Sequence, residues 1–331
     1  MPARVAINGM GRVGRATLRI LRETADLELV AVNDLASAEE LAYLVQYDSF
    51  YGRCAEQVRH EDGALLVGDE RYRVCNERDP AGLPWREIGV DLVFECTGTF
   101  TRREELEKHV RAGAGQVILS APAKGDDVPF VVYGVNAADG ERVISCASCT
   151  TNCIAPVIEV IGRRIGLRKA IMTTIHSYTV SQPLVDVRAS KRRRGRAGAI
   201  NFVPTSTGAA GATARALPQY AGRFDGQAIR APVPVGSIAD ITIVTEQPTS
   251  VETVNAVLEE EAASSRYEGV MGVTRDAIVS SDIIGDPRGS IVDLSLTQVV
   301  DGDLVKIMSW YDNEWGYAAQ MVRQARRMVT A

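Results

Sequence analysis

The segment Ser148–Ala155 carries a cysteine at its second position, and a histidine, His176, follows downstream. A thiol attacks carbon as its thiolate, and a helix N-terminus or a nearby imidazole favours that form. Ser148 is a good helix cap, and apolar residues follow it at roughly helical spacing. Although a lone cysteine in an apolar helix is more often a core residue, the polar flank Ser-Cys-Thr-Thr-Asn favours a site. The pattern predicts that Cys149 is a reactive cysteine that opens a helix, with His176 available to activate it.

Composition restricts the classes of protein to which the chain can belong. Its 331 residues suffice for two domains, and its 46% hydrophobic and 24% charged residues are ordinary for a globular protein. No apolar run approaches the roughly 20 residues of a membrane span, and Val5–Ile7 follows too soon for a signal peptide. We therefore expect a cytoplasmic protein without membrane association. A net charge of −5 argues against nucleic-acid binding. The six cysteines are scattered or close together in sequence and indicate no disulfide framework, and the three histidines without paired C-x-x-C units make a zinc site unexpected.

The N-terminal segment has the pattern of a dinucleotide-binding turn. A short apolar strand, Val5–Asn8, runs into Gly9-Met10-Gly11-Arg12-Val13-Gly14 and then into a helix at Arg15–Thr24. In this context the first glycine permits the tight turn, the second lets the backbone approach a pyrophosphate, and the third allows close helix packing. Asp34 ends the next strand, about twenty residues on, where a carboxylate binds ribose hydroxyls and repels a 2′-phosphate. These residues predict binding of NAD.

Alternation of strands and helices continues up to the cysteine. Apolar strands are expected at 91–95, 116–120, 130–133 and 143–145, with a charged helix at 102–112, which favours a doubly wound parallel sheet. Beyond Cys149 the strands at 170–175, 239–245, 289–296 and 304–310 are separated by loops and one helix, 251–263, which favours a largely antiparallel sheet. We expect an α/β protein with a Rossmann domain at 1–148, completed by a C-terminal helix within 314–331, and an α+β catalytic domain at 149–313.

From end to end the chain resembles phosphorylating glyceraldehyde-3-phosphate dehydrogenase of the bacterial type. Six segments carry the resemblance in the family's order: Asn8–Gly14, Ala147–Asn152, His176–Thr179, Pro204–Ala210, Ile229–Pro232 and Ser309–Gly316. The resemblance implies oxidation of D-glyceraldehyde 3-phosphate by NAD through a hemithioacetal and a thioester on Cys149, with His176 as the base. Inorganic phosphate then releases 1,3-bisphosphoglycerate.

The resemblance also implies binding residues. Positions that match the two anion sites, for substrate phosphate and attacking phosphate, are Ser148, Thr150, Thr179, Arg194, Thr207, Gly208 and Arg230. Positions that match the cofactor site are Gly9, Gly11, Arg12, Val13, Gly14, Asp34, Arg78, Ser120 and Asn313. The basic run Lys191–Arg196 alone could be a nucleic-acid patch or a solvated face. The resemblance places it in the long loop that shapes a neighbouring subunit's cofactor site, and hence implies a homotetramer.

The sequence departs from the family's usual pattern at Cys146, Val180–Ser181, Val187–Arg188 and Gly236–Ser237. Val187–Arg188 stands where NAD-dependent members carry Leu-Pro near the adenosine ribose. An arginine there can pair with a 2′-phosphate, so we expect NAD to be preferred and NADP to be possible. Val180–Ser181 replaces a polar pair beside the Thr179 phosphate site.

Two other functions fit parts of the sequence. An erythrose-4-phosphate dehydrogenase would use the same cysteine and histidine, but such relatives usually lack the stretch Thr205–Gly208; a specialised paralogue would look the same as this chain. A redox sensor is the alternative from another class, because Cys146 and Cys153 flank Cys149. A pure sensor would need neither the dinucleotide turn nor the phosphate sites. NADH production from each sugar phosphate, with and without inorganic phosphate, separates these functions.

Overall fold

The computed structural model describes residues 1–330, which form two compact units. Unit 1 contains Met1–Val131, Ala137–Ala147 and the chain from Met321 onward, and unit 2 contains Val132–Asn136 and Ser148–Gln320. Compared with the expected domains, the short segment 132–136 and the first turns of the C-terminal helix group with unit 2. Within residues 1–330, no helix combines the length and the apolar character needed to cross a bilayer.

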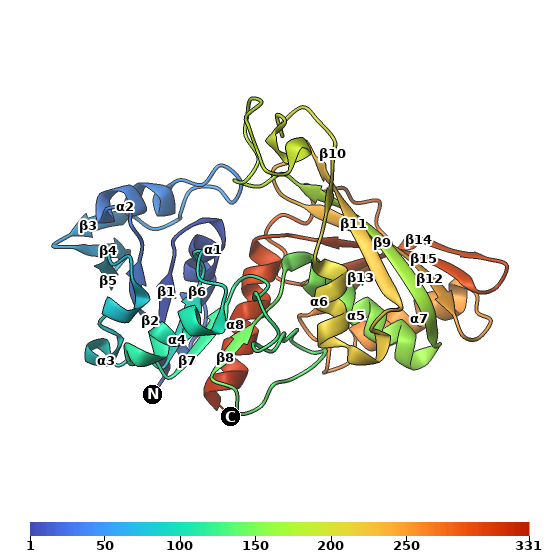
Figure 1. Cartoon of the computed structure of the whole chain (residues 1–331), viewed down its shortest axis with the longest axis horizontal. Coiled ribbons are helices and arrows are strands. Elements are labelled where there is room, and N and C mark those ends of the chain that lie inside the picture. Colours follow the sequence, from blue (N-terminus) through green and yellow to red (C-terminus); the bar gives the residue numbers. More distant parts are fainter. Residues whose placement is uncertain (331) are drawn as a thin grey trace. The chain divides into compact units, whose positions relative to one another are not determined.

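Unit 1 is built on an eight-stranded sheet in the order β3-β4-β5-β2-β1-β6-β7-β8, with all pairs from β5 to β8 parallel (Figure 1). Its strands are β1 (Ala3–Asn8), β2 (Leu27–Asn33), β3 (Val58–Glu61), β4 (Ala64–Val67), β5 (Glu70–Cys75), β6 (Leu92–Glu95), β7 (Gln116–Leu119) and β8 (Val143–Ser145). From the central strand β1 the chain order runs outward to β2 on one side and to β6 on the other. Ligands of such sheets bind at the carboxyl ends of the strands where the order reverses.

Short helices connect these strands. They are α1 (Arg12–Leu21), α2 (Ala38–Gln46), α3 (Trp85–Ile88), α4 (Arg103–Arg111) and the 3-10 turn η1 (Pro80–Gly82). The end of α8 (Trp315–Thr330) also belongs here, since Gln116 donates a hydrogen bond to the carbonyl of Met328 at 3.2 Å and Arg326 pairs with Asp26 at 2.7 Å.

Unit 2 contains a seven-stranded sheet in the order β10-β11-β9-β12-β15-β14-β13, in which only β9/β11 and β13/β14 are parallel (Figure 1). Its strands are β9 (Leu167–Ser177), β10 (Val203–Ser206), β11 (Phe224–Ala231), β12 (Ser237–Thr245), β13 (Met271–Thr274), β14 (Ser290–Val300) and β15 (Leu304–Tyr311). The helices are α5 (Cys149–Arg164), α6 (Ala209–Ala216) and α7 (Val251–Ala262), with 3-10 turns η2 (Arg192–Gly195) and η3 (Pro218–Tyr220). The three helices and the sheet share one apolar core.

The expected fold class, a parallel Rossmann sheet and a second, largely antiparallel sheet, is confirmed. One expected strand is wrong: residues 130–133 form only an isolated bridge from Phe130 to Ser145. Tyr133 instead packs against the core of unit 2, together with buried Val132 and Val135. Several elements were not predicted at all, namely α2, the strands β3 to β5, β10, α6 and β11. The strands β3, β4 and β10 are only four residues long and show no clear period. For α2 a signal was present, because Ser37 and Glu40 form a capping box.

Candidate active site and cofactor cavity

Cys149 is the first residue of helix α5, as expected. The helix begins there because the Ser148 side chain accepts the backbone N–H of Thr151 at 3.1 Å, in the manner of an N-cap. Ala147, the residue before the cap, has a φ of 55°, a left-handed conformation that alanine adopts at some cost in free energy. Such strain is common where a fold must aim a functional group.

His176 lies near the end of β9, and its Nε2 atom is 3.4 Å from Sγ of Cys149. On the other side of the ring, Nδ1 is 2.8 Å from the carbonyl oxygen of Ser177. A proton on Nδ1, donated to this carbonyl, leaves Nε2 the lone pair that can accept the proton of the thiol, whereas the Nη1–H of Arg230, 2.6 Å from Nδ1, favours the other tautomer. The structure thus brings together the two residues that are far apart in the sequence, in the geometry of a nucleophile and its base.

Arg230 is the cation nearest to this pair. The parallel pairing of β9 with β11 places Arg230 directly opposite His176, with Nη1 of the arginine 2.6 Å from Nδ1 of the histidine and 2.8 Å from the carbonyl of Ser177. Burial lowers the pKa of His176 to about 3, and the charges of Arg230 and Arg194 act in the same direction. Burial raises the pKa of the Cys149 thiol, while Arg230 and the hydroxyl of Thr150 oppose this. Burial therefore favours the neutral form of both groups, whereas the start of the helix and Arg230 favour the thiolate.

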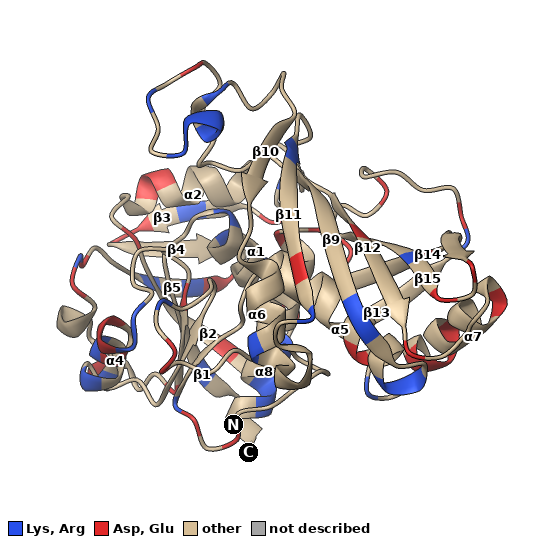
Figure 2. Cartoon of the chain, turned by 45° about the vertical axis from the view of Figure 1, so that its right-hand side comes forward, with Lys and Arg blue, Asp and Glu red and all other residues tan. Residues whose placement is uncertain are grey.

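The same arginines have the features of an anion site. Arg194 lowers the pKa of Arg230 further than burial alone does, because two positive charges face each other. The Nε atoms of both guanidiniums are buried and bond to no atom of the described residues. An oxyanion would satisfy these donors and cancel the repulsion. Arg194 belongs to the basic loop that precedes β10 (Figure 2).

The remaining predicted anion ligands are polar groups with varied accessibility. Thr179 and Thr207 are partly exposed, and Gly208 precedes helix α6 without a side chain to cap it. Thr150 is different, because it is buried and its hydroxyl lies 2.9 Å from Oη of Tyr311, which is itself 2.7 Å from Thr174. This hydroxyl can hold the start of α5 against the sheet as well as face a ligand.

A cavity of about 330 Å³ opens in unit 1 at the carboxyl ends of β1 and β2, where this fold binds nucleotides. Of the predicted cofactor residues, Gly9, Gly11, Asp34 and Arg78 line it. A Cβ atom on Gly9 would lie 2.6 Å from the backbone nitrogen of Thr97, and nothing lies within 4 Å of one on Gly11. Only glycine therefore fits at position 9, and the space beside the backbone of Gly11 is free for a diphosphate. Both features suit the binding of NAD.

Asp34 and Gly14 hold the glycine turn in place, Asp34 through hydrogen bonds and Gly14 through close packing. One oxygen of Asp34 accepts the backbone N–H of Met10 at 2.7 Å and the other that of Ala36 at 3.0 Å. A Cβ atom on Gly14 would lie 2.0 Å from the carbonyl oxygen of Gly9, so only glycine lets the helix approach. Arg12, Val13, Gly14 and Ser120 do not line the cavity. Arg12 is bound instead to Asp48 at 2.6 Å and lies over the ring of Phe50.

Asn313, the last predicted cofactor residue, belongs to unit 2 and has a fixed amide orientation. Its Oδ1 atom accepts hydrogen bonds from Ser177 Oγ at 2.8 Å, Ser237 Oγ at 3.1 Å and Gly236 N at 3.2 Å. The Nδ2 group is therefore presented as a donor, as a carboxamide oxygen requires. Two of the three donors come from Gly236–Ser237, one of the departures from the family's pattern.

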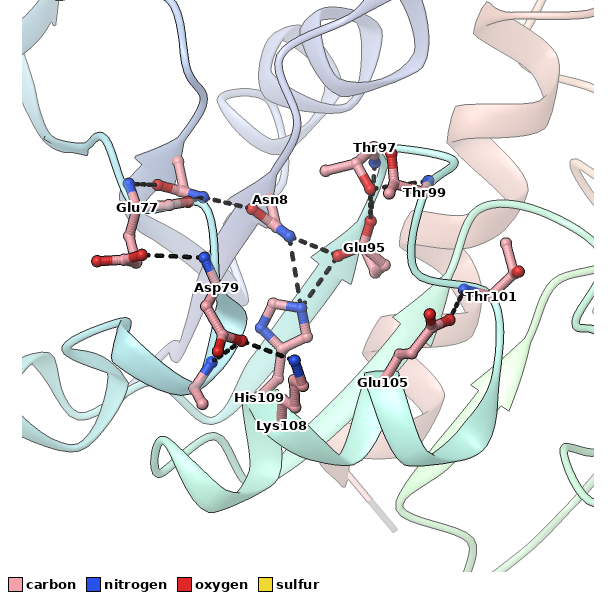
Figure 3. A network of polar contacts seen from close by, with 12 residues as sticks. Asn8, Glu77, Asp79, Glu95, Thr97, Thr99, Thr101, Glu105, Lys108 and His109 are labelled. Atoms are coloured by element: carbon pink, nitrogen blue, oxygen red, sulfur yellow. Dashed lines mark hydrogen bonds and ion pairs between the residues drawn. The ribbon is translucent and has the colours of Figure 1, made fainter.

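The loop Cys96–Thr99 leaves the carboxyl end of its strand, where the sequence predicts ligand binding, and Cys96, Thr97 and Thr99 line the cavity. Other lining residues were not predicted, namely Asn8, Asn33, Leu35, Glu77 and Phe100. A signal for some of them was present, because Asn8 and Asn33 are polar residues that end apolar strands. Below the cavity, Asn8 contacts a buried group formed by Glu95 and His109 (Figure 3). This group was not predicted, since His109 reads as part of a charged surface helix.

Comparisons with known proteins agree with this architecture. Residues 3–103 match the family model "Glyceraldehyde 3-phosphate dehydrogenase, NAD binding domain", and residues 148–313 match "Glyceraldehyde 3-phosphate dehydrogenase, C-terminal domain". The chain is 46% identical over 327 residues to glyceraldehyde-3-phosphate dehydrogenase of Streptomyces coelicolor, with 97% of each chain covered. It is 47% identical over 328 residues to that of Clostridium pasteurianum, covering 97% of this chain and 96% of the relative. The chain therefore belongs to the glyceraldehyde-3-phosphate dehydrogenase family of NAD-dependent oxidoreductases.

Proposed function

We propose that this protein oxidises D-glyceraldehyde 3-phosphate with NAD and inorganic phosphate, forming 1,3-bisphosphoglycerate. The observation that carries the proposal is Sγ of Cys149 at 3.4 Å from Nε2 of His176, at the start of a helix and beside two arginines, in a chain of this family. The reaction needs a nucleophile, a base and two anion sites, and residues of each kind are present.

The residues of the site can carry out the proton transfer and the nucleophilic attack that the reaction requires. His176 accepts the thiol proton at Nε2 as Cys149 adds to the aldehyde, which gives a hemithioacetal. The phosphate of the substrate neutralises the charges of Arg230 and Arg194, which otherwise depress the pKa of His176. The base thereby strengthens when substrate is bound. NAD, when bound, would supply the acceptor for the hydride that converts the hemithioacetal into a thioester. Inorganic phosphate then attacks the thioester carbonyl, the bond to Sγ breaks, and the acyl phosphate leaves while the Cys149 thiolate is restored.

For the phosphates we propose Ser148, Thr150, Thr179, Arg194, Thr207, Gly208 and Arg230. For NAD we propose Gly9, Gly11, Arg12, Val13, Gly14, Asp34, Arg78, Ser120 and Asn313. Asp34 favours NAD, because a carboxylate at the adenosine ribose repels a 2′-phosphate. Slower use of NADP is part of the proposal, because Arg188, which is exposed, can pair with a 2′-phosphate.

We further propose a cytoplasmic homotetramer. Support comes from the segment 180–202, which exposes large apolar side chains although it is rich in arginine: Val180, Leu184, Val185, Val187, Ile200 and Phe202. Exposed apolar side chains on one segment are typical of a surface that another chain covers. Light scattering and sedimentation of the purified protein measure this state directly.

The test of the proposed activity is NADH production from glyceraldehyde 3-phosphate and from erythrose 4-phosphate, each with and without phosphate. We expect rapid turnover only with the triose and with phosphate present. Faster oxidation of the tetrose would identify the erythrose-4-phosphate activity instead. Burial raises the pKa of Cys146 and of Cys153 to about 12, which disfavours their thiolates and counts against a redox sensor.

A further inference from the structure

Three side chains beneath the cofactor cavity are completely buried: Glu95 at the end of β6, His109 on α4 and Trp85 on α3 are each 0% exposed. Burial of a carboxylate is costly unless hydrogen bonds replace its hydration. Within residues 1–330 no lysine or arginine forms an ion pair with Glu95. The one titratable side chain that contacts it there is the imidazole of His109, whose Nε2 lies 3.0 Å from Oε2.

The hydrogen bond from Trp85 fixes the state of that imidazole. Indole Nε1–H can only donate, and it lies 3.0 Å from Nδ1 of His109. Nδ1 is therefore the acceptor, and the proton of the neutral ring is on Nε2, which faces the Oε2 atom of Glu95. His109 thus acts as a hydrogen-bond donor to the carboxylate.

A second chain of hydrogen bonds reaches the same oxygen from the cavity. Nδ2 of Asn8 donates to Oε2 of Glu95 at 2.5 Å, which leaves Oδ1 of Asn8 to accept from Nδ2 of Asn33 at 2.6 Å. Oδ1 of Asn33 in turn accepts the backbone N–H of Glu77 at 2.9 Å. The carboxylate therefore sets the orientation of both amides, since a flipped Asn8 would turn its oxygen toward Glu95 (Figure 3).

The other oxygen of Glu95 organises the loop after β6. Oε1 accepts the backbone N–H of Thr97 at 2.9 Å and also its hydroxyl, and the same hydroxyl oxygen accepts the backbone N–H of Thr99 at 3.1 Å. Asn8, Asn33, Glu77, Thr97 and Thr99 all line the cavity, whereas Glu95, His109 and Trp85 do not. One buried carboxylate thus collects donors from two sides of the cavity wall.

We infer that Glu95, held by His109, is a positioning residue for the dinucleotide: it fixes the polar wall of the cavity without touching the ligand. The inference rests on the proposed binding of NAD in this cavity. Glu95 and His109 should therefore affect the affinity for NAD. They should not affect the chemistry at Cys149, which belongs to unit 2.

The experiment compares Glu95→Gln with Glu105→Gln. Glutamine has one acceptor oxygen, so at position 95 its NH2 group must face donors on one side. Glu105, also within this region, accepts the backbone N–H groups of Thr101 and Arg102 at 2.8 and 2.9 Å and does not line the cavity. We expect Glu95→Gln to raise the Kd and KM for NAD at least about tenfold, as for the loss of one or two buried hydrogen bonds. The kcat and the rate of Cys149 alkylation by iodoacetamide should stay within about twofold of wild type.

Glu105→Gln should leave the KM for NAD unchanged, because both N–H groups bind one oxygen of Glu105 and glutamine keeps one acceptor oxygen. The inference is wrong if Glu95→Gln binds NAD as wild type does, if Glu105→Gln weakens NAD equally, or if kcat falls in step with affinity. If Glu95→Gln does not fold, a second pair of variants tests the inference. His109→Gln keeps a hydrogen-bond donor toward Glu95, whereas His109→Leu does not, so His109→Gln should bind NAD more tightly. Equal affinities of the two variants for NAD would refute the inference. Failure of the wild-type protein itself to bind NAD would instead refute the proposed function.

Discussion

Sγ of Cys149 lies 3.4 Å from Nε2 of His176, although the two residues are 27 positions apart in the chain. The distance allows direct proton transfer, and the opposite ring nitrogen can be held by the carbonyl of Ser177 at 2.8 Å. Burial favours the neutral form of both residues, because it raises the pKa of the thiol and lowers that of the imidazole. Ionisation of the pair therefore accompanies the binding and addition of substrate.

Replacement of either residue should abolish or strongly reduce oxidation. Cys149→Ala removes the nucleophile, so NADH formation from glyceraldehyde 3-phosphate should disappear while NAD binding remains. His176→Asn removes the base, and turnover should fall by about two orders of magnitude or more. Stopped-flow measurement of the NADH burst checks both, and a normal burst in Cys149→Ala would disprove the mechanism.

Loss of the cap at Ser148 should affect both stability and the site. Ser148→Ala should cost about 1 kcal/mol of unfolding free energy, the usual value for an N-cap, and should slow alkylation of Cys149. Ser250 caps α7 in the same unit, accepting the backbone N–H of Thr253 at 3.2 Å, and provides the control. Ser250→Ala should lower stability by a similar amount and leave alkylation unchanged. Equal alkylation rates in the two variants would show that the cap serves stability alone.

Cofactor choice should depend on Arg188. We expect kcat/KM to favour NAD, NADP turnover to be measurable, and Arg188→Pro to lose the NADP activity while the NAD activity persists. Arg192→Leu, from the same loop and surface hollow, should leave the ratio of the two activities unchanged. If NADP turnover is absent, or survives Arg188→Pro, Arg188 has no part in this choice.

Acid should weaken the contribution of Asp48 to stability. Although burial raises its pKa, the backbone N–H groups of Tyr51 and Phe50 and the Arg12 guanidinium outweigh this, so the pKa lies below its ordinary value. Its contribution to folding is then complete above about pH 4, the unfolded value, and is lost as the pH falls through the folded pKa. Melting curves of Asp48→Asn and wild type should differ at pH 7 and converge toward pH 2.

The exposed pair Asp26–Arg326, at 2.7 Å, offers a comparison for this experiment. Asp26→Asn should change the melting temperature little at any pH, because exposed ion pairs contribute little. A difference between wild type and Asp48→Asn that persists unchanged at pH 2 would mean that packing, not charge, explains its effect.

The sequence alone determined the elements whose local pattern is strong. The order of strand, glycine turn and helix at Val5–Thr24 identified a dinucleotide fold. Each glycine is needed because a side chain would clash with backbone or change the turn, and most of these constraints arise from residues nearby in the sequence. Ser148 and the apolar spacing after it identified the start of α5, since capping and helical period are also local. The family's motifs supplied the pairing of Cys149 with His176, which no local pattern could give.

Only the tertiary structure decided which distant residues meet. The parallel pairing of β9 with β11 puts Arg230 opposite His176. The register of two strands so far apart in the chain cannot be predicted from the sequence of either strand. Glu95 and His109 are the clearest case, because Glu95 is a carboxylate at the end of an apolar strand and His109 lies in a helix whose charge predicts exposure. Their burial becomes possible only when Trp85, Asn8 and Thr97 supply donors from other elements, and that compensation exists only in the folded chain.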